Sequence, residues 1–258
     1  MKISDSRILH ALFFLVCFVA VAIVSAVNNV SVPAIATLTE KRLVVIDAGH
    51  GGADGGCVGV NGCVEKDINL AIAKNLADML RASGFEVVMT RDSDVSIHDN
   101  GVEGLRQQKI SDMENRLEII KSYPDSVFVS IHQNQYTSPE YFGGQMFYTT
   151  NNPLNFRLAR IMQEEFARLQ EGNDREIKLI DNGLYLFKNT TQPAILIECG
   201  FLSNEEDASL LSDSVYQKKV AFAIYKGLMT HFADTKTTNV EITEEFSSGK
   251  AADTLYMQ

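Results

Sequence analysis

The sequence predicts an α/β fold, a single-domain sandwich in which helices cover both faces of a largely parallel, twisted sheet. Short apolar runs alternate with helical patterns between residues 41 and 232, which is the signature of such a sheet. No internal repeat or Gly/Ser-rich linker divides this segment, and its size is typical of one domain. The chain is 45% hydrophobic, which is ample for a packed core.

The predicted elements follow one another in alternation. Short runs rich in β-branched and aromatic residues predict strands over 43–46, 85–89, 127–131, 145–149 and 194–197. Apolar residues at helical spacing predict helices over 68–83, 106–121, 155–169 and 213–232. The first helix is expected to end at Gly84, a residue that favours the helix C-terminus, and the second ends before Pro124.

The two ends of the chain differ from this central segment. Residues 8–27 are a 20-residue apolar run, so residues 1–27 are expected to be a signal peptide or an N-terminal membrane anchor, and the length favours the anchor. Either way, the rest of the chain is expected outside the cell membrane, with 28–40 as a linker. Residues 233–258 are polar and acidic and are expected to be a disordered tail.

The charge balance excludes one class of function. The chain has 23 basic and 33 acidic side chains, a formal net charge of −10. Nucleic-acid binding needs clustered lysine and arginine to neutralise phosphates, so a nucleic-acid partner is not expected.

Polar side chains come shortly after three of the predicted strands. His50, His132 and Glu198 each hold such a position, and Glu65 lies in the loop before the first predicted helix. Because the carboxyl ends of parallel strands meet at one edge of a sheet, these four side chains are expected to converge there. Two imidazoles and one carboxylate make a catalytic zinc site with an open fourth position, and a second glutamate can move the proton.

Other interpretations of the same region remain open from the residues alone. Asp47 could orient a neighbouring side chain, and the glycine-rich stretch 49–62 could be a plain flexible loop. Cys57, Cys63 and Cys199 are interpreted as small side chains rather than as nucleophiles or zinc ligands. A disulfide between Cys57 and Cys63 is compatible with export.

Four motifs carry a family resemblance. They are DAGHGGADGG at 47–56, EKD at 65–67, SIHQN at 130–134 and ECGFLSN at 198–204. Together they resemble the zinc-dependent N-acetylmuramoyl-L-alanine amidases of the amidase-3 type, and the resemblance covers residues 42–232. It implies that His50, Glu65 and His132 hold Zn²⁺ and that Glu198 is the catalytic acid/base. It also implies that the bond cut joins the lactyl group of muramic acid to L-alanine in peptidoglycan.

Within this family the chain looks most like the sporulation enzymes that trim spore-cortex peptidoglycan so that muramic lactam can form. That likeness implies action outside the membrane, in the wall or spore-cortex region. Only residues 135–143 separate the second histidine motif from the next strand, too few for an inhibitory helix, while activation by a partner protein stays open. Competing hypotheses are a zinc peptidase or deacetylase acting on peptidoglycan, and a non-catalytic wall-binding or assembly module.

Three residues are expected in the substrate groove: Asn134, Arg91 and Asn204. Arg91 and Arg116 could pair with carboxylates of the stem peptide because the arginine fork suits that geometry. Surface salt bridges are the commoner role for such arginines.

Overall fold

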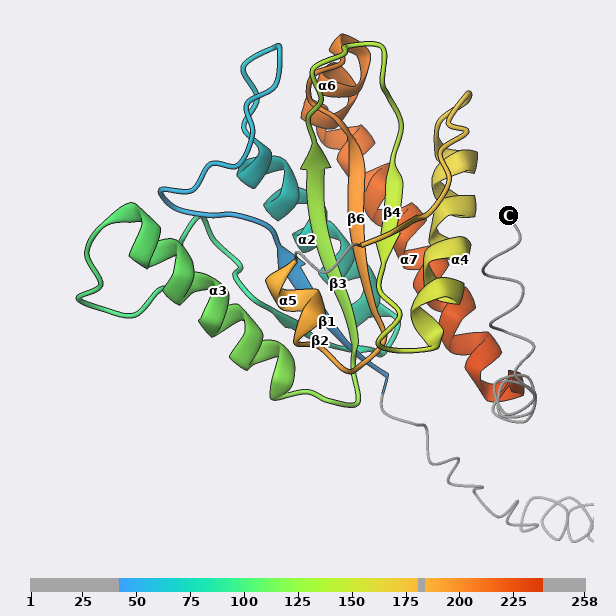
Figure 1. Cartoon of the computed structure of the whole chain (residues 1–258). Coiled ribbons are helices and arrows are strands. Elements are labelled where there is room, and N and C mark those ends of the chain that lie inside the picture. The colour runs from blue at the N-terminus through green and yellow to red at the C-terminus, as the bar shows by residue number, and fades with distance from the viewer. Residues whose placement is uncertain (1–41, 181–183, 239–258) are drawn as a thin grey trace, which may run out of the picture. The chain divides into compact units, whose positions relative to one another are not determined.

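A six-stranded sheet forms the centre of the fold (Figure 1), in the order β2-β1-β3-β6-β4-β5. The computed structural model describes residues 42–180 and 184–238. The strands are β1 (Leu43–Ala48), β2 (Glu86–Met89), β3 (Val127–Asn134), β4 (Gln145–Tyr148), β5 (Lys178–Leu179) and β6 (Ala194–Phe201). The pairs β1–β2, β1–β3, β3–β6 and β4–β5 are parallel, and only β4–β6 is antiparallel. The predicted largely parallel sheet is therefore confirmed.

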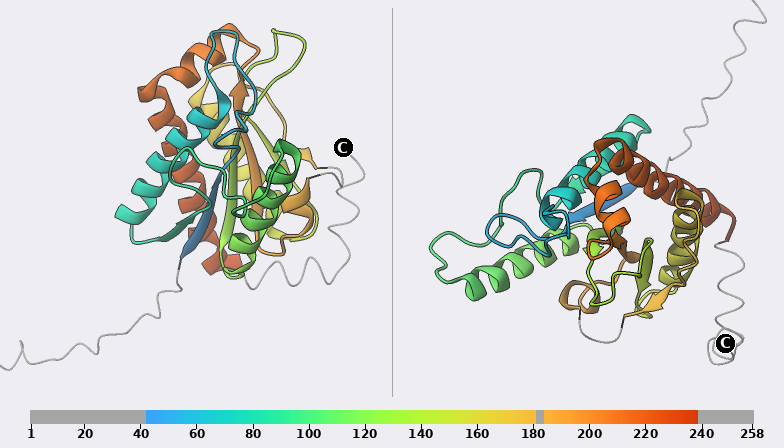
Figure 2. Two further views of the ribbon diagram at one scale, coloured as in Figure 1. Left: turned by 90° about the vertical axis from the view of Figure 1, so that its left-hand side faces the viewer. Right: turned by 90° about the horizontal axis from the view of Figure 1, so that it is seen from above.

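Helices cover both faces of this sheet, as predicted. On one face lie α2 (Glu65–Ala82), α4 (Leu154–Leu169) and α7 (Ser214–Thr238), and on the other lie α3 (Leu105–Lys121) and α5 (Tyr185–Lys188) (Figure 2). Each face has its own apolar core, because side chains alternate between the two sides of a strand. In β1, for example, Val44 and Ile46 belong to the larger core under α2, α4 and α7, whereas Val45 belongs to the core under α3 and α5.

Some helix boundaries differ from the prediction. Helix α2 begins at Glu65, so this residue opens the helix rather than preceding it in a loop. Helix α7 continues past Phe232 to Thr238. The short helices α5 and α6 (Glu205–Ser212) were not predicted, although Asn204 caps α6 by accepting a hydrogen bond from the backbone of Asp207 and three acidic residues follow it. An asparagine before acidic residues is a helix-start signal that the apolar pattern alone does not contain.

The buried residues of helix α3 differ in part from the apolar residues that the helical spacing predicted to face the core. Leu117 and Ile120 are buried against the sheet as expected, whereas Ile110 is 44% exposed. The same helix also buries a charged residue, because Arg116 is only 2% exposed.

The expectations for the chain ends concern residues that lie mostly outside the described part of the structure. Residues 1–41 and 239–258 are outside it, and with them the predicted anchor or signal peptide, the linker and most of the tail. Among the helices that are described, none combines the length and the apolar character needed to cross a membrane.

Candidate metal centre

The carboxyl ends of three neighbouring parallel strands build one site. His50 lies two residues beyond the end of β1, and His132 and Glu198 lie on β3 and β6, where they are register partners. Glu65, the first residue of α2, reaches the same place from the N-terminus of that helix. The convergence predicted from parallel strand ends is therefore present in the fold.

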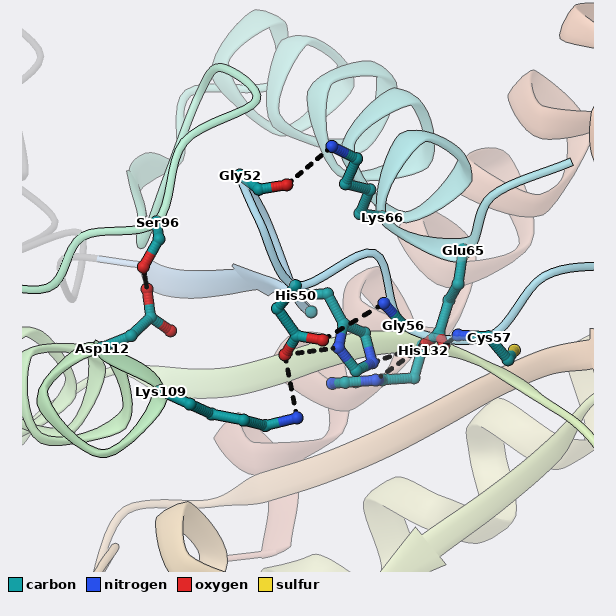
Figure 3. Close-up of polar contacts among 12 residues, drawn as sticks. His50, Gly52, Gly56, Cys57, Glu65, Lys66, Ser96, Lys109, Asp112 and His132 are labelled. Carbon is teal, nitrogen blue, oxygen red and sulfur yellow. Dashed lines mark hydrogen bonds and ion pairs between the residues drawn. The ribbon is translucent and has the colours of Figure 1, made fainter. Parts of the chain in front are cut away.

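His50, Glu65 and His132 form a compact group of donor atoms (Figure 3). One atom from each residue can be chosen so that all three lie within 4.8 Å of one another. Glu65 Oε1 lies 3.2 Å from His50 Nε2 and 3.0 Å from His132 Nδ1. Two imidazoles and one carboxylate that point at a common position are the ligand set of a catalytic zinc site.

Glu65 is held in place by neutral donors as well as by the histidines. Its Oε1 accepts hydrogen bonds from the Asn69 side chain at 3.2 Å and the Gln133 backbone at 3.1 Å, and its Oε2 accepts one from the Cys57 backbone at 2.9 Å. Burial raises the pKa of Glu65, but the hydrogen bonds and positive charge of His132 and His50 outweigh it and hold that pKa well below its usual range. The carboxylate is therefore ionised, and it faces the two imidazole rings.

Asp54 fixes the orientation of the His50 ring. Its Oδ2 lies 3.0 Å from His50 Nδ1, so Nε2 is the ring atom that faces Glu65 and is left for a metal. A carboxylate on the far nitrogen of a ligating histidine commonly sets its tautomer and ring angle. Asp54 also pairs with Lys109 at 2.9 Å. Sequence reasoning did not select either residue, although a histidine followed four residues later by an aspartate was an available signal for Asp54.

The loop that carries His50 is clamped by two buried arginines. Arg116 donates from Nη1 to the carbonyl of Ala48 at 2.9 Å and from Nη2 to that of His50 at 2.7 Å. Arg91 donates to the carbonyls of Ala48 at 2.9 Å and Gly49 at 3.0 Å. His50 itself has φ 62, a left-handed conformation that non-glycine residues adopt only where their surroundings enforce it.

These contacts correct the predicted roles of the two arginines. Arg91 is 3% exposed, does not line the cavity at the metal centre, and is occupied by main-chain carbonyls, so it is neither a groove residue nor a surface salt bridge. Arg116 is ion-paired with Asp47 at 2.5 Å and with Asp112 at 2.6 Å. Asp47 thus orients a neighbouring side chain, as one of the interpretations above proposed, and that side chain is Arg116.

Glu198 lies on β6, next to His132 on the neighbouring strand. Its Oε2 is buried and has no hydrogen-bond partner, and burial raises the pKa of this carboxyl to about 7. A carboxyl whose pKa lies near neutrality can take up and release a proton at working pH. Glu198 lines a cavity of about 500 Å³ together with His50 and His132.

Of the two remaining residues predicted for the substrate groove, one lines the cavity and the other does not. Asn134 lines the same cavity. Asn204 does not, because its side chain caps α6 and donates to the carbonyl of Pro139 at 2.7 Å. The thiols of Cys57, Cys63 and Cys199 are free, so the compatible Cys57–Cys63 disulfide is not formed here.

An α/β sheet with a His–Glu–His group and a buried, unpaired glutamate at its carboxyl edge is the arrangement of a hydrolytic metalloenzyme. Comparison with known proteins identifies the family. Residues 44–230 match the N-acetylmuramoyl-L-alanine amidase family (Amidase_3), and the chain belongs to it. The family membership and enzyme class predicted from the four motifs are therefore confirmed.

Individual relatives agree with this assignment. The chain is 39% identical over 193 residues to the germination-specific N-acetylmuramoyl-L-alanine amidase of Bacillus subtilis, covering 75% of this chain and 81% of the relative. Among solved structures it is similar to the CwlD amidase of Clostridioides difficile in complex with the GerS lipoprotein, with 39% identity, a TM-score of 0.72, and coverage of 75% of this chain and 99% of that one. The amidase AmiC2 of Nostoc punctiforme is 30% identical with a TM-score of 0.63, covering 74% and 97%.

Proposed function

We propose that this chain is a zinc-dependent amidase that hydrolyses the bond between N-acetylmuramic acid and L-alanine in peptidoglycan. The observation that carries the proposal is the convergence of His50, Glu65 and His132 beside the buried carboxyl of Glu198. Family membership favours this reaction over the alternatives of a peptidase or deacetylase.

The donor set fits zinc in particular. Two nitrogen donors and one carboxylate oxygen are typical of zinc rather than of magnesium or calcium, which prefer all-oxygen sites. The ligand set proposed is His50 Nε2, His132 Nδ1 and Glu65 Oε1. When bound, Zn²⁺ supplies a Lewis acid that polarises the amide carbonyl and lowers the pKa of water.

Glu198 is proposed to carry the proton of the reaction. As a carboxylate it takes a proton from the attacking water, and as the acid it gives a proton to the leaving nitrogen of L-alanine when the C–N bond breaks. Because Glu198 lines the cavity, a substrate bound there lies within reach of its carboxyl group. Asn134, which also lines the cavity, is proposed as a substrate contact.

The proposed setting is maturation of the spore cortex outside the membrane, where removal of stem peptides allows muramic lactam to form. The support is the name of the Bacillus subtilis relative, a germination-specific amidase. The Clostridioides difficile relative was solved with a lipoprotein, which supports a protein partner for this chain as well. Export and membrane attachment through residues 8–27 remain part of this proposal.

Digestion of isolated cortex peptidoglycan by the full chain tests the proposal. Zinc-loaded protein is expected to release intact stem peptides and leave free lactyl ends on muramic acid, and mass spectrometry of the products detects both. Protein stripped by a chelator is expected to release none until Zn²⁺ is restored. Deacetylated sugars or cleaved peptides would instead support the other enzyme classes, and no product with a saturated metal site would support a non-catalytic module.

Substitution of Gly49 tests the metal site separately. A Cβ added at Gly49 would lie 2.2 Å from Cε1 and 2.3 Å from Nε2 of His132, so the Gly49→Ala variant must displace that ring. We expect zinc affinity to fall about 10- to 100-fold, measured by competition with a chromogenic chelator. Gly62→Ala is the matched control, because no atom lies within 4 Å of its added Cβ although φ is +84. Equal zinc affinity in both variants would argue against His132 as a ligand.

A further inference from the structure

The cavity at the metal centre has one exposed cation among its described lining residues. Its charged lining residues are acidic except for two, Arg116 and Lys109, among the described residues. Arg116 is buried, and its guanidinium donates to two aspartates and two carbonyls. The Lys109 side chain is 58% exposed, so its ammonium is the cation that a ligand in the cavity can reach.

Lys109 stands next to the metal ligands. Its Nζ lies 2.9 Å from Asp54 Oδ2, and the same oxygen lies 3.0 Å from Nδ1 of His50. Figure 3 shows the side chain reaching from α3 toward His50. The carboxylate of Asp54 and the ring of His50 therefore lie between the ammonium and the position at which the three ligand atoms converge. An ammonium has three donors, and the contact with Asp54 occupies one of them.

We infer that Lys109 binds a free carboxylate of the stem peptide, on the residue that follows L-alanine. This inference rests on the proposed function and adds the part of the substrate that the site recognises. In peptidoglycan this second residue is D-glutamate, or its amide, and its carboxyl group is about one residue length, roughly 3.8 Å per step, from the alanine.

The cavity suits the peptide rather than the glycan. A glycan strand continues in both directions from each muramic acid, so it must pass across an open surface. The peptide branches off at the scissile bond and can enter a recess. Besides its polar and charged residues, the recess has apolar lining side chains from α3, β4 and β6, namely Met113, Phe147 and Leu196, which can contact the aliphatic parts of a peptide.

Two matched substrates test the inference: muramoyl peptides in which the second residue is either D-glutamate or its α-amide, D-isoglutamine. We expect kcat/KM to be about tenfold higher for the carboxylate than for the amide, because a charge-assisted hydrogen bond is lost in the second. In Lys109→Gln this ratio should fall to about one. Lys121→Gln removes an exposed lysine from the same helix and should keep the wild-type ratio. Any general effect on the metal through Asp54 cancels in the ratio.

Binding of the released peptides, in which the γ-carboxyl of the second residue is bonded to a third residue, is measured by calorimetry on the same variants and does not require turnover. A carboxylate preference that Lys109→Gln retains in both assays would overturn the inference, as would equal kcat/KM for the two substrates in the wild type. Carboxylate-dependent binding that is lost in Lys109→Gln, combined with no hydrolysis of either substrate, would uphold Lys109 as the anchor and overturn the proposed function alone.

Discussion

Replacement of Glu198 by glutamine is expected to lower kcat about 10³-fold while the protein remains folded and binds zinc. Glutamine has nearly the same shape but cannot take up or release the proton, and removal of a general acid/base typically costs 10²- to 10⁴-fold. Release of stem peptides, zinc content by mass spectrometry and the thermal midpoint measure the three properties. Because Glu198 is not among the three ligand atoms, zinc content should equal that of the wild type.

Glu118→Gln provides the control for this substitution. It makes the same chemical change at an exposed position of α3 and should leave kcat unaltered. If Glu198→Gln retains more than about a tenth of the wild-type kcat, the proton is carried by another group. Loss of zinc from the variant would instead place Glu198 among the ligands.

Replacement of Arg116 by methionine is expected to have the largest effect on stability. Arg116 is 2% exposed and is paired with Asp47, itself buried, so the variant leaves a carboxylate without its partner. Breaking a buried pair in this way costs about 3–5 kcal/mol of the free energy of unfolding, a large share of a typical total. Urea unfolding at pH 7 measures the loss. Zinc affinity should also fall, because the His50 carbonyl loses its donor.

Two comparisons separate the ion pair from general damage to α3. Arg106→Met, at an exposed position of the same helix, should change the free energy of unfolding by no more than about 0.5 kcal/mol. Adding Asp47→Asn to Arg116→Met should recover part of the loss, since no unpaired charge then remains. Additive losses in the double variant would contradict the assignment of the cost to an uncompensated Asp47.

The same pair predicts a pH dependence. Burial raises the pKa of Asp47, but the charge of Arg116, together with His132 and hydrogen bonds from Ser130 and Thr90, outweighs burial and brings the pKa from 3.8 to about 2. A carboxyl whose pKa is depressed in the folded state stabilises the fold above its unfolded pKa, and this contribution is lost as pH falls through the folded value. The difference in stability between wild type and Arg116→Met should therefore narrow between about pH 4 and pH 2. A constant difference would argue against this pairing.

The sequence was sufficient for the parts of the fold that depend on regular pattern. Buried parallel strands are continuous apolar runs, so β1, β3 and β6 could be located, and polar residues at their ends had to share one edge. That rule predicted the convergence of His50, His132 and Glu198. Strand β5 has only two residues, both exposed, and carries no pattern that sequence reasoning could use.

The fate of charged side chains was harder to predict. Arg91 and Arg116 were expected to pair with stem-peptide carboxylates, which the arginine fork suits, or to form surface salt bridges, which are commoner. Both arginines donate to the carbonyl of Ala48 at the end of β1, far away in the sequence, and Arg116 also pairs with Asp47 on that strand, so these contacts arise only in the folded chain. Lys109, by contrast, stands in the cavity, and nothing in its local sequence distinguishes it from other lysines on helices.

The hydrogen bonds of Arg91 and Arg116 to the loop at His50 do not involve a metal ion. Because Arg91 and Arg116 hold the loop through its carbonyls, the backbone around His50 is positioned by the protein's own side chains. Folding then does not have to wait for the metal, in contrast to small domains in which the ion itself supplies the folding free energy. The metal-free protein is consequently expected to keep the backbone of the site in place.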